Sequence, residues 1–380
     1  MRKIFGFFKK ELMLTVALGA AIVSLIITPP TIELFKDIDY RTLGTLFMML
    51  CVLEGFKKED IFRPIIRFAG KMNTMLTLSL FLIFSVFFTS MFVTNDVSLI
   101  IFVPLTIILF RAGGKEKYIL PVITMENIAA IRGSMLMPFG SPQNLFLFGQ
   151  SGRSVFEFIL HMAPLSVMSG VLLVIFALVL YRKDLKQGIV VDESKTVSGN
   201  TENRKKQKIC YIVLFALIIL TIVSRTSYWY ASAIVVAVAV FFCDREIYKR
   251  VDYVLLLTFF CFFVFSSSIA ANPVISDFLR KAVGGHEYLW AILLSQVISN
   301  VPASIVLWPF TTNLSALLYG ADTAGLCSII GSLASVINYR IYVREYPKNG
   351  KKFLVTFTLI SWAFFIIVVL PGYFLSSWQF

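Results

Sequence analysis

Two short polar clusters lie inside strongly apolar stretches of the chain, and their residue types suit ion binding. The first cluster is Thr94-Asn95-Asp96, and the second is Ser299-Asn300. Their hydroxyl, amide and carboxyl oxygens are ligands that hard cations such as Na⁺ prefer. A chain that turns at such a cluster also frees backbone amides, which suit an anion. Because polar groups in a bilayer must be satisfied, we expect both clusters to line a cavity or a binding site.

The two clusters belong to a repeated stretch. Residues 90–106 read SMFVTNDVSLIIFVPLT, and residues 295–311 read SQVISNVPASIVLWPFT. A constant shift of 205 positions places Asn95 on Asn300. Polar breaks at corresponding places of two halves indicate the binding site of a transporter, so we place candidate sodium sites at Asn95 and Asn300. The alternative, polar side chains that only bond between helices, leaves the matched spacing unexplained.

Three ionisable residues lie in the same apolar surroundings. Asp96, whose repeat partner is Val301, is a candidate for cation or proton binding. The alternative is a carboxylate satisfied by the backbone amides of its own turn. Arg132 could hold an anionic substrate or pair with an acid, and Glu126 lies six residues before it. The alternative for Arg132 and Glu126 is an internal structural ion pair or a side chain that reaches the interface.

Two glycine-containing breaks interrupt later apolar runs. Such breaks predict half-helices around an unwound centre, which supplies carbonyls and hydroxyls near the polar clusters, although a simple kink is the alternative. The residues of these breaks that we add as candidates for substrate or ion binding are Gly140, Ser141, Pro142, Asn144, Gly331 and Ser332.

The composition predicts an all-α polytopic membrane protein. The chain is 58% hydrophobic and 15% charged, with a mean hydropathy of +0.81, which a soluble protein could not bury. The net charge of +13 comes from basic residues in short loops between apolar runs, which argues against nucleic acid as a partner. The five cysteines and two histidines show no metal-site or disulfide spacing. Without a nucleotide-binding motif or a nucleophile–base pair, the sequence predicts neither an enzyme nor a cofactor other than sodium.

The apolar runs divide the chain into two membrane repeats and a linker. The first repeat is 1–181, with a hairpin at about 72–110 and a broken helix at about 118–150. A polar cytoplasmic linker follows at 182–208. The second repeat is 209–380, with a hairpin at about 286–320 and a broken helix at about 322–342. We also expect surface helices at 61–70 and 272–285.

The hairpins are favoured over pairs of full spans because one arm is short. The helix from Asp96 to Arg111 would rise roughly 22 Å, less than the ~30 Å hydrocarbon core, although the longer inbound arm leaves two spans open. Of 35 Lys and Arg residues, 28 fall in segments that this topology places inside and 6 in segments outside. The prediction is a multi-pass protein, of the inner membrane if prokaryotic. Its N-terminus is cytoplasmic, its C-terminus is outside, and its repeats are inverted.

The chain resembles the ion transporter superfamily in three stretches, namely residues 90–106, GSPQNLFLFG at 140–149 and residues 295–311. The superfamily includes sodium–dicarboxylate symporters, citrate–metal symporters, arsenite-pump membrane subunits and a class of sodium/proton antiporters. This chain is identified as a member of an uncharacterised anion-permease branch. The resemblance implies inverted repeats, a usually dimeric assembly, and a transport domain that moves like an elevator past a scaffold.

The resemblance also assigns residues. In the dicarboxylate branch, Ser-Asn-Thr tips and a Gly-Thr-Pro-Pro-Asn segment bind sodium and a substrate carboxylate. The matching positions here are Thr94, Asn95, Ser299 and Asn300 in the tips and Gly140, Ser141, Pro142 and Asn144 in the segment. The chain departs from the pattern at Asp96, at Val301-Pro302 and at Gly331-Ser332. These departures weaken the case for dicarboxylate specificity and for two equivalent sodium sites.

These observations predict a secondary active transporter for a small anion, a carboxylate or an inorganic oxyanion, coupled to sodium or protons. One alternative is a sodium/proton antiporter in which Asp96 is the ion-binding acid. Another is a passive channel or the membrane subunit of an ATPase-driven efflux pump. The expected partners are the anion, the coupling cation, the lipid bilayer and a second copy of the chain.

Overall fold

The computed structural model describes residues 11–62, 64, 68, 69, 72–183, 188 and 205–378. Within this part of the chain there is no β-sheet, and the bridge between Thr74 and Gly188 is isolated. The prediction of an all-α fold is therefore confirmed. The expected surface helix at 61–70 and the linker at 182–208 lie largely outside the described residues.

The described helices include six that are long and apolar enough to cross a membrane. These are Met75–Val93, Asn95–Ala112, Val155–Leu180, Lys206–Val223, Tyr253–Ala270 and Pro347–Ser376. Large apolar side chains such as Phe156, Ile234 and Leu359 are exposed on the outer helices. An apolar surface of this extent would be costly in water, so it faces lipid. The chain is therefore a multi-pass membrane protein.

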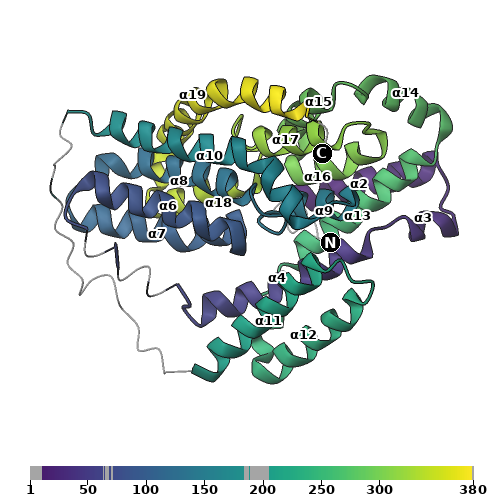
Figure 1. Ribbon diagram of the computed structural model, residues 1–380, viewed down its shortest axis with the longest axis horizontal. Coiled ribbons are helices and arrows are strands. Elements are labelled where there is room, and N and C mark those ends of the chain that lie inside the picture. Colours follow the sequence, from purple (N-terminus) through teal and green to yellow (C-terminus); the bar gives the residue numbers. More distant parts are fainter. Residues whose placement is uncertain are drawn as a thin grey trace.

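The first half contains the predicted hairpin and broken helix (Figure 1). Its helices are α2 (Leu12–Ile27), α3 (Ile32–Lys36), α4 (Tyr40–Lys58), α6 (Met75–Val93), α7 (Asn95–Ala112), α8 (Ile119–Ser134), α9 (Pro142–Ser151) and α10 (Val155–Leu180). Polar caps set several of these starts. The side chain of Asp39 accepts a hydrogen bond from the Thr42 amide (2.9 Å) at the start of α4, and Ser154 and Glu157 form a capping box at the start of α10.

The second half repeats this order after an additional helix. Its helices are α11 (Lys205–Val223), α12 (Trp229–Cys243), α13 (Tyr253–Ala270), α14 (Pro273–Val283), α15 (Glu287–Ile298), α16 (Asn300–Leu307), α17 (Leu314–Ala324), α18 (Leu333–Glu345) and α19 (Gly350–Ser376). The broken helix begins at Leu314, within the range 286–320 that the sequence assigned to the hairpin. The Asn313 side chain caps it by accepting from the Ala316 amide (3.1 Å). The polar residues Thr311-Thr312-Asn313 interrupt the apolar run directly before this start, so the sequence marks the boundary although the prediction placed it later.

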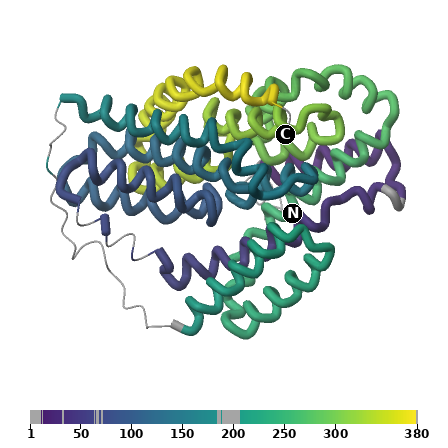
Figure 2. The backbone as a smooth tube through the Cα atoms, viewed as in Figure 1, coloured from purple at the N-terminus to yellow at the C-terminus, as the bar shows by residue number. Residues whose placement is uncertain are grey.

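The helices form two bodies, which we call the outer body and the core body. The outer body consists of α2, α3, α4, α11, α12, α13 and α14, with α2 against α13 and α4 against α11 and α12. The core body consists of the hairpins, the broken helices, α10 and α19, with α6 against α8, α15 against α17 and α18 against α7. Figure 2 shows that blue and yellow segments, far apart in sequence, run together in the core body. Each half of the chain therefore contributes to both bodies.

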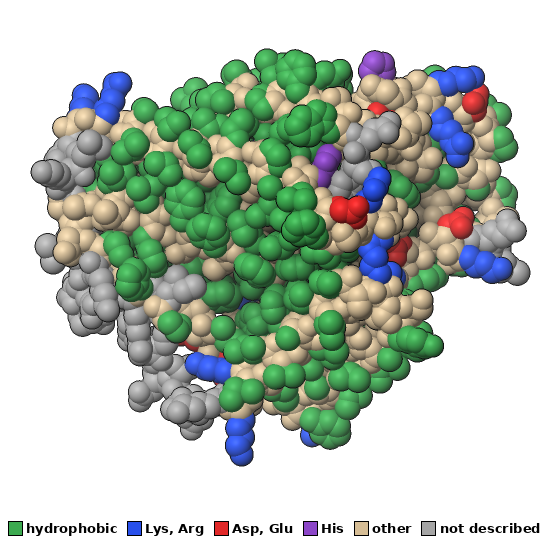
Figure 3. Space-filling model, in the orientation of Figure 1, with side chains coloured by type: hydrophobic (Ala, Val, Ile, Leu, Met, Phe, Trp, Pro, Cys, Tyr) green, Lys and Arg blue, Asp and Glu red, His purple; other side chains and the backbone are tan. Residues whose placement is uncertain are grey.

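The surface of the molecule agrees with this arrangement. Figure 3 shows apolar side chains over most of the visible face, with charged side chains gathered toward its margins. The exposed apolar residues include Val167 and Val171 of α10 and Ile366 and Leu370 of α19. These two helices therefore present a lipid-facing side of the core body, and the polar clusters lie inside it.

Candidate functional site

Each hairpin turns at a single residue with an unusual backbone conformation. Thr94 joins α6 to α7 with φ 72° and ψ 154°, and Ser299 joins α15 to α16 with φ 69° and ψ 158°. Residues other than glycine rarely occupy this region, because their Cβ atoms crowd the backbone. The arms of each hairpin pack against each other. Each polar cluster thus lies at the turn between two packed helices, as predicted. The arms of the second hairpin, α15 and α16, are short, whereas α6 and α7 are each long enough to cross a membrane, so the alternative of two full spans stays open for the first.

The residues after the turns begin new helices and are buried. Asn300 donates from its backbone amide to the carbonyl of Gly331 (3.2 Å) and from Nδ2 to the carbonyl of Ala321 (3.3 Å). These bonds tie the second hairpin tip to the second broken helix. Asn95 instead accepts from the Asp96 amide through Oδ1 (2.9 Å). The asparagines therefore occupy matching places but make different contacts.

Asp96 lies in the first turn of α7 and is partly buried. Its Oδ1 atom is covered and has no hydrogen-bond partner. Among the described residues, no backbone amide is recorded as donating to this carboxylate. The structural alternative, in which the turn satisfies Asp96, is therefore not observed. A carboxylate oxygen without a donor at a helix start is available to a cation or a proton.

The broken helices share a second backbone device. Residues 135–141 separate α8 from α9, and residues 325–332 separate α17 from α18. A Cβ added to Gly140 would lie 2.2 Å from the Ser134 carbonyl oxygen, and one added to Gly331 would lie 2.4 Å from that of Ala324. Both glycines thus pack on the carbonyl end of the preceding half-helix. This close approach leaves no space for a side chain.

The two breaks meet at a buried arginine and a buried acid. Gln143 donates from Nε2 to Asp322 Oδ1 (3.0 Å), and Arg132 donates from Nη1 to the backbone carbonyl of Asp322 (3.3 Å). Both ionisable side chains are fully buried. Arg132 Nε and Nη2 and Asp322 Oδ2 have no hydrogen-bond partner. Buried charges that are not fully paired are costly, so this arrangement suits a site that receives a charged ligand.

Glu126 does not contribute to this junction. Its Oε1 atom accepts a hydrogen bond from the Thr106 hydroxyl of α7, and its Oε2 atom has no partner. The ion pair between Glu126 and Arg132 that the sequence left open is therefore not formed. The six-residue spacing places the two side chains on different faces of α8, because an α-helix repeats every ~3.6 residues.

Buried polar atoms without partners are concentrated in these elements. The described part of the chain contains seventeen such side-chain atoms, and twelve belong to the hairpins and broken helices. They include atoms of the predicted residues Ser141, Asn144 and Ser299, in addition to those of Asp96, Glu126 and Arg132. Native proteins leave few buried polar atoms unsatisfied. Nine of the twelve lie at, or within three residues of, the hairpin turns and helix breaks, and this is where we expect a ligand to bind.

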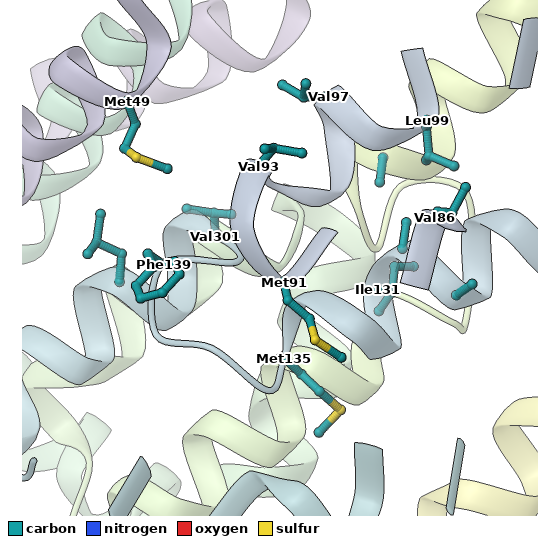
Figure 4. Packing of buried hydrophobic residues seen from close by; sticks show 14 of the residues in the cluster. Met49, Val86, Met91, Val93, Val97, Leu99, Ile131, Met135, Phe139 and Val301 are labelled. Carbon is teal, nitrogen blue, oxygen red and sulfur yellow. The ribbon is translucent and has the colours of Figure 1, made fainter. Parts of the chain in front are cut away.

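Apolar side chains surround these polar groups. Figure 4 shows Val93 and Val301 of the hairpin tips, Phe139 of the first break and Met49 of α4 among the buried hydrophobic residues of this region. The Phe139 ring also lies 6.3 Å from that of Phe92, next to the first tip. Val301, the repeat partner of Asp96, is thus part of an apolar wall. Such a wall limits the access of water to the polar groups.

The sequence analysis missed two residues of this junction, Asp322 and Gln143. Asp322 lies in the apolar run LSALLYGADTAG. An ionisable residue inside an apolar run is the signal that makes Asp96 a candidate, and Asp322 shows the same signal. The predicted broken helix begins at Asp322, so the sequence prediction treats this residue as the end of a helix and not as a buried carboxylate. Gln143 lies inside the predicted break, but no sequence signal identifies its partner on α17.

Comparisons with known proteins show to which family the chain is similar. The family model described as "Citrate transporter" (CitMHS) matches residues 4–331. An uncharacterised transporter of Methanocaldococcus jannaschii, MJ0456, is 30% identical over 96% of this chain and 97% of its own length. The inner membrane protein YbiR of Escherichia coli is 28% identical over 88% of this chain and 89% of its own. The crystal structure of the Alcanivorax borkumensis YdaH transporter is similar in fold, with a TM-score of 0.57 and 13% identity over 97% of this chain and 96% of the other.

Proposed function

Because the chain belongs to the citrate transporter family CitMHS of the ion transporter superfamily, we propose that it is a secondary active transporter for a small anion. Membership makes it a membrane transporter rather than an enzyme. The proposed substrate is a carboxylate or an inorganic oxyanion, moved together with sodium or protons. The observation that carries this proposal is the buried Arg132, two of whose donor nitrogens have no partner.

The guanidinium of Arg132 suits an anion because its donors form a rigid fork. Two parallel N–H groups can bind both oxygens of a carboxylate or oxyanion. Its contact with the Asp322 carbonyl orients the side chain. The half-helix α9, which begins at Pro142, adds backbone amides with the positive end of a helix dipole. Neutral amides and one arginine could therefore receive an anion without a metal ion.

The two bodies support a further part of the proposal, an elevator-type movement of the core body past the outer body. Contacts between them include Ser266 Oγ donating to the Ile305 carbonyl (2.9 Å) and Arg225 Nη2 donating to the Phe148 carbonyl (2.6 Å). The core body holds the tips and breaks, so its movement would carry the site. Few polar contacts would have to break, which keeps such a movement inexpensive.

The domain limits and the orientation belong to the same proposal. We assign residues 1–181 and 209–380 to two inverted repeats and 182–208 to a cytoplasmic linker. The second half has three helices, α11 to α13, before its surface helix α14, whereas the first half has α2, the five-residue α3 and α4. The second half would therefore cross the membrane once more than the first before its hairpin, so its hairpin would enter from the opposite side. This agrees with a cytoplasmic N-terminus and an outer C-terminus. Homodimer formation follows from the family resemblance.

A thermal-unfolding scan of the purified protein tests the proposed function. The ligand panel contains citrate, dicarboxylates, phosphate, sulfate and arsenite, each in sodium and in choline buffer at two pH values. A ligand that binds only the folded state stabilises it by about 2.7 kcal/mol at 100 times its dissociation constant. We expect one anion to raise the unfolding midpoint, and more so with sodium or at low pH. No response to any anion would contradict an anion site.

The unpartnered Oδ1 of Asp96 favours one second candidate, a sodium/proton antiporter. In that case sodium or lithium alone would raise the unfolding midpoint, and no anion would. Asp96→Asn would then eliminate cation-dependent proton flux in proteoliposomes. An unchanged flux in this variant would exclude Asp96 as the ion-binding acid.

A further inference from the structure

A second group of buried polar residues lies where α7, α8 and α18 pack against one another. It consists of Thr106 on α7, Glu126 and Asn127 on α8, and Ser335 and Asn338 on α18. All five side chains are fully buried. Four of these residues are not candidates in the sequence analysis, and none contacts Arg132 through a recorded hydrogen bond. The group therefore needs an explanation of its own.

Thr106, Asn127 and Asn338 each donate one hydrogen bond in this group, and three oxygen atoms remain without a hydrogen-bond partner. Thr106 donates its hydroxyl to Glu126 Oε1, and Asn127 donates from Nδ2 to Ser335 Oγ (3.0 Å). Asn338 donates from Nδ2 to the backbone carbonyl of Ile123 (2.7 Å), one helical turn before Asn127. The atoms that remain without a partner are Glu126 Oε2, Asn127 Oδ1 and Asn338 Oδ1. All three are acceptors, so a positively charged species would satisfy them.

No positive side chain meets this need in the described residues. Glu126 has no ion pair, and α6 has no charged residue. None of the described charged residues on the other elements packed on α8 is hydrogen-bonded to or paired with Glu126: Glu116 and Lys117 in the 3-10 helix Glu116–Tyr118, Asp96 and Arg111 at the ends of α7, Glu157 and His161 near the start of α10, the exposed Arg340 with Arg344 and Glu345 in the later part of α18, and Lys351 and Lys352 at the start of α19. A buried carboxylate without a counter-charge is costly. A bound monovalent cation, Na⁺ or H⁺, removes this cost.

We propose that Glu126, with the amide oxygens of Asn127 and Asn338, forms a monovalent-cation site that is separate from the hairpin tips and takes up the coupling ion. Carboxylate and amide oxygens are ligands for a hard cation. The hydrogen bond of Thr106 to a carboxylate is not repeated at its repeat partner Thr311, whose hydroxyl donates to the carbonyl of Leu307 (2.9 Å). The coupling role rests on the proposed transport function, whereas the cation site itself does not.

The test measures the unfolding midpoint of the purified full-length protein without substrate anion. Sodium chloride is compared with choline chloride at equal ionic strength, at pH 5.5 and pH 8, for the wild type, Glu126→Gln and Asn338→Ala. The matched control is Glu287→Gln, a buried glutamate whose Oε1 accepts from the Thr312 amide (2.9 Å) and hydroxyl (2.6 Å) and from the Asn313 amide (3.1 Å). The control loses the negative charge of its carboxylate, while the amide oxygen can still accept these bonds, and it does not touch the proposed site.

We expect sodium or the lower pH to raise the wild-type midpoint by about 2 to 4 °C. This rise should be smaller in Glu126→Gln and Asn338→Ala than in the wild type, because only sodium bound at the hairpin tips would still stabilise these variants, and it should persist in full in Glu287→Gln. A reduced sodium response identifies the cation as Na⁺, and a reduced pH response identifies it as H⁺. Equal responses in wild type and Glu126→Gln, or no response in the wild type, would overturn the site. Citrate added to the same proteins tests the anion site independently, so failure of either proposal is recognised separately.

Discussion

Thr94 and Ser299 turn the chain with almost the same backbone angles, φ 72° and ψ 154° in one and φ 69° and ψ 158° in the other. The hairpins around them nevertheless differ. The arms of the first are 19 and 18 residues long, and those of the second are 12 and 8. The first tip continues with the partly buried carboxylate Asp96, and the second continues with the apolar Val301. The backbone turn is thus repeated, and the side-chain chemistry is not.

The broken helices show the same relation. Gly140 and Gly331 pack on carbonyl oxygens in the same way, but α8 ends near an arginine and α17 ends near an aspartate. Arg132 and Asp322 then meet through the Asp322 carbonyl. The two halves therefore build one asymmetric junction of buried charged side chains rather than two copies of it, and we propose this junction as the site. Predictions that change one half at a time can test this.

The largest expected effect is on anion binding when Arg132 is neutralised. Arg132→Gln removes two free donors of a charged group, and each hydrogen bond to a charged group contributes about 1.5 to 3 kcal/mol. We expect about 100-fold weaker anion binding, measured as the anion concentration that raises the unfolding midpoint. The exposed Arg153, paired with Glu157 at 3.7 Å, supplies the control Arg153→Gln. Wild-type anion affinity in Arg132→Gln would show that the halves do not share this site.

Substitution of the two glycines should destabilise both halves to a similar extent. An added methyl group at Gly140 or Gly331 would overlap a backbone carbonyl oxygen, and such overpacking costs about 1 to 3 kcal/mol. We expect Gly140→Ala and Gly331→Ala to lower the unfolding midpoint. Gly19→Ala on α2, where nothing lies within 4 Å of the added atom, should not lower it. A lower unfolding midpoint in only one of the two variants would show that the two broken helices do not depend on their glycines in the same way.

The smallest expected effect concerns the two turn residues. The backbone conformation of the two turn residues costs about 1 to 3 kcal/mol for residues other than glycine. Glycine avoids this strain, but it loses about 0.5 to 1 kcal/mol more chain entropy on folding. Thr94→Gly and Ser299→Gly should therefore each raise the unfolding free energy by about 1 kcal/mol. Thr89→Gly, inside α6, should lower it, because glycine has a lower helix propensity than threonine and the hydrogen bond of the Thr89 hydroxyl to Ser98 Oγ (3.0 Å) is lost. Equal increases in the unfolding free energy of Thr94→Gly and Ser299→Gly would show that the two turns are equally strained. Decreases as large as that of Thr89→Gly would show that the turns are not strained.

Much of the fold follows from sequence patterns that act locally. The matched stretches around Asn95 and Asn300 predicted both hairpins, because a polar cluster within an apolar run has few solutions in a bilayer. Gly140 and Gly331 predicted both broken helices for a similar reason. The start of α17 at Leu314 was predicted too late, at about residue 322, although the polar residues Thr311-Thr312-Asn313 interrupt the apolar run directly before it.

The candidate site was predicted less completely, because it depends on contacts between distant segments. The contact of Gln143 with Asp322 joins residues 179 positions apart, and no local pattern specifies such a pair. The same holds for Asn127 with Ser335, which lie 208 positions apart. Arg132 and Asp96 were predicted only because they are ionisable residues inside apolar stretches of the sequence. Whether they bind ligand remains a prediction.

The most direct test of the central claim is uptake into proteoliposomes by purified wild type, Asn95→Ala and Asn300→Ala. The substrate is the radiolabelled form of the anion that stabilises the protein most, supplied with inward sodium and proton gradients. We predict saturable, gradient-driven accumulation by the wild type and its loss in both variants, with each variant still folded in the membrane. Uptake by both variants at the wild-type rate would contradict a transport site built from the two hairpin tips.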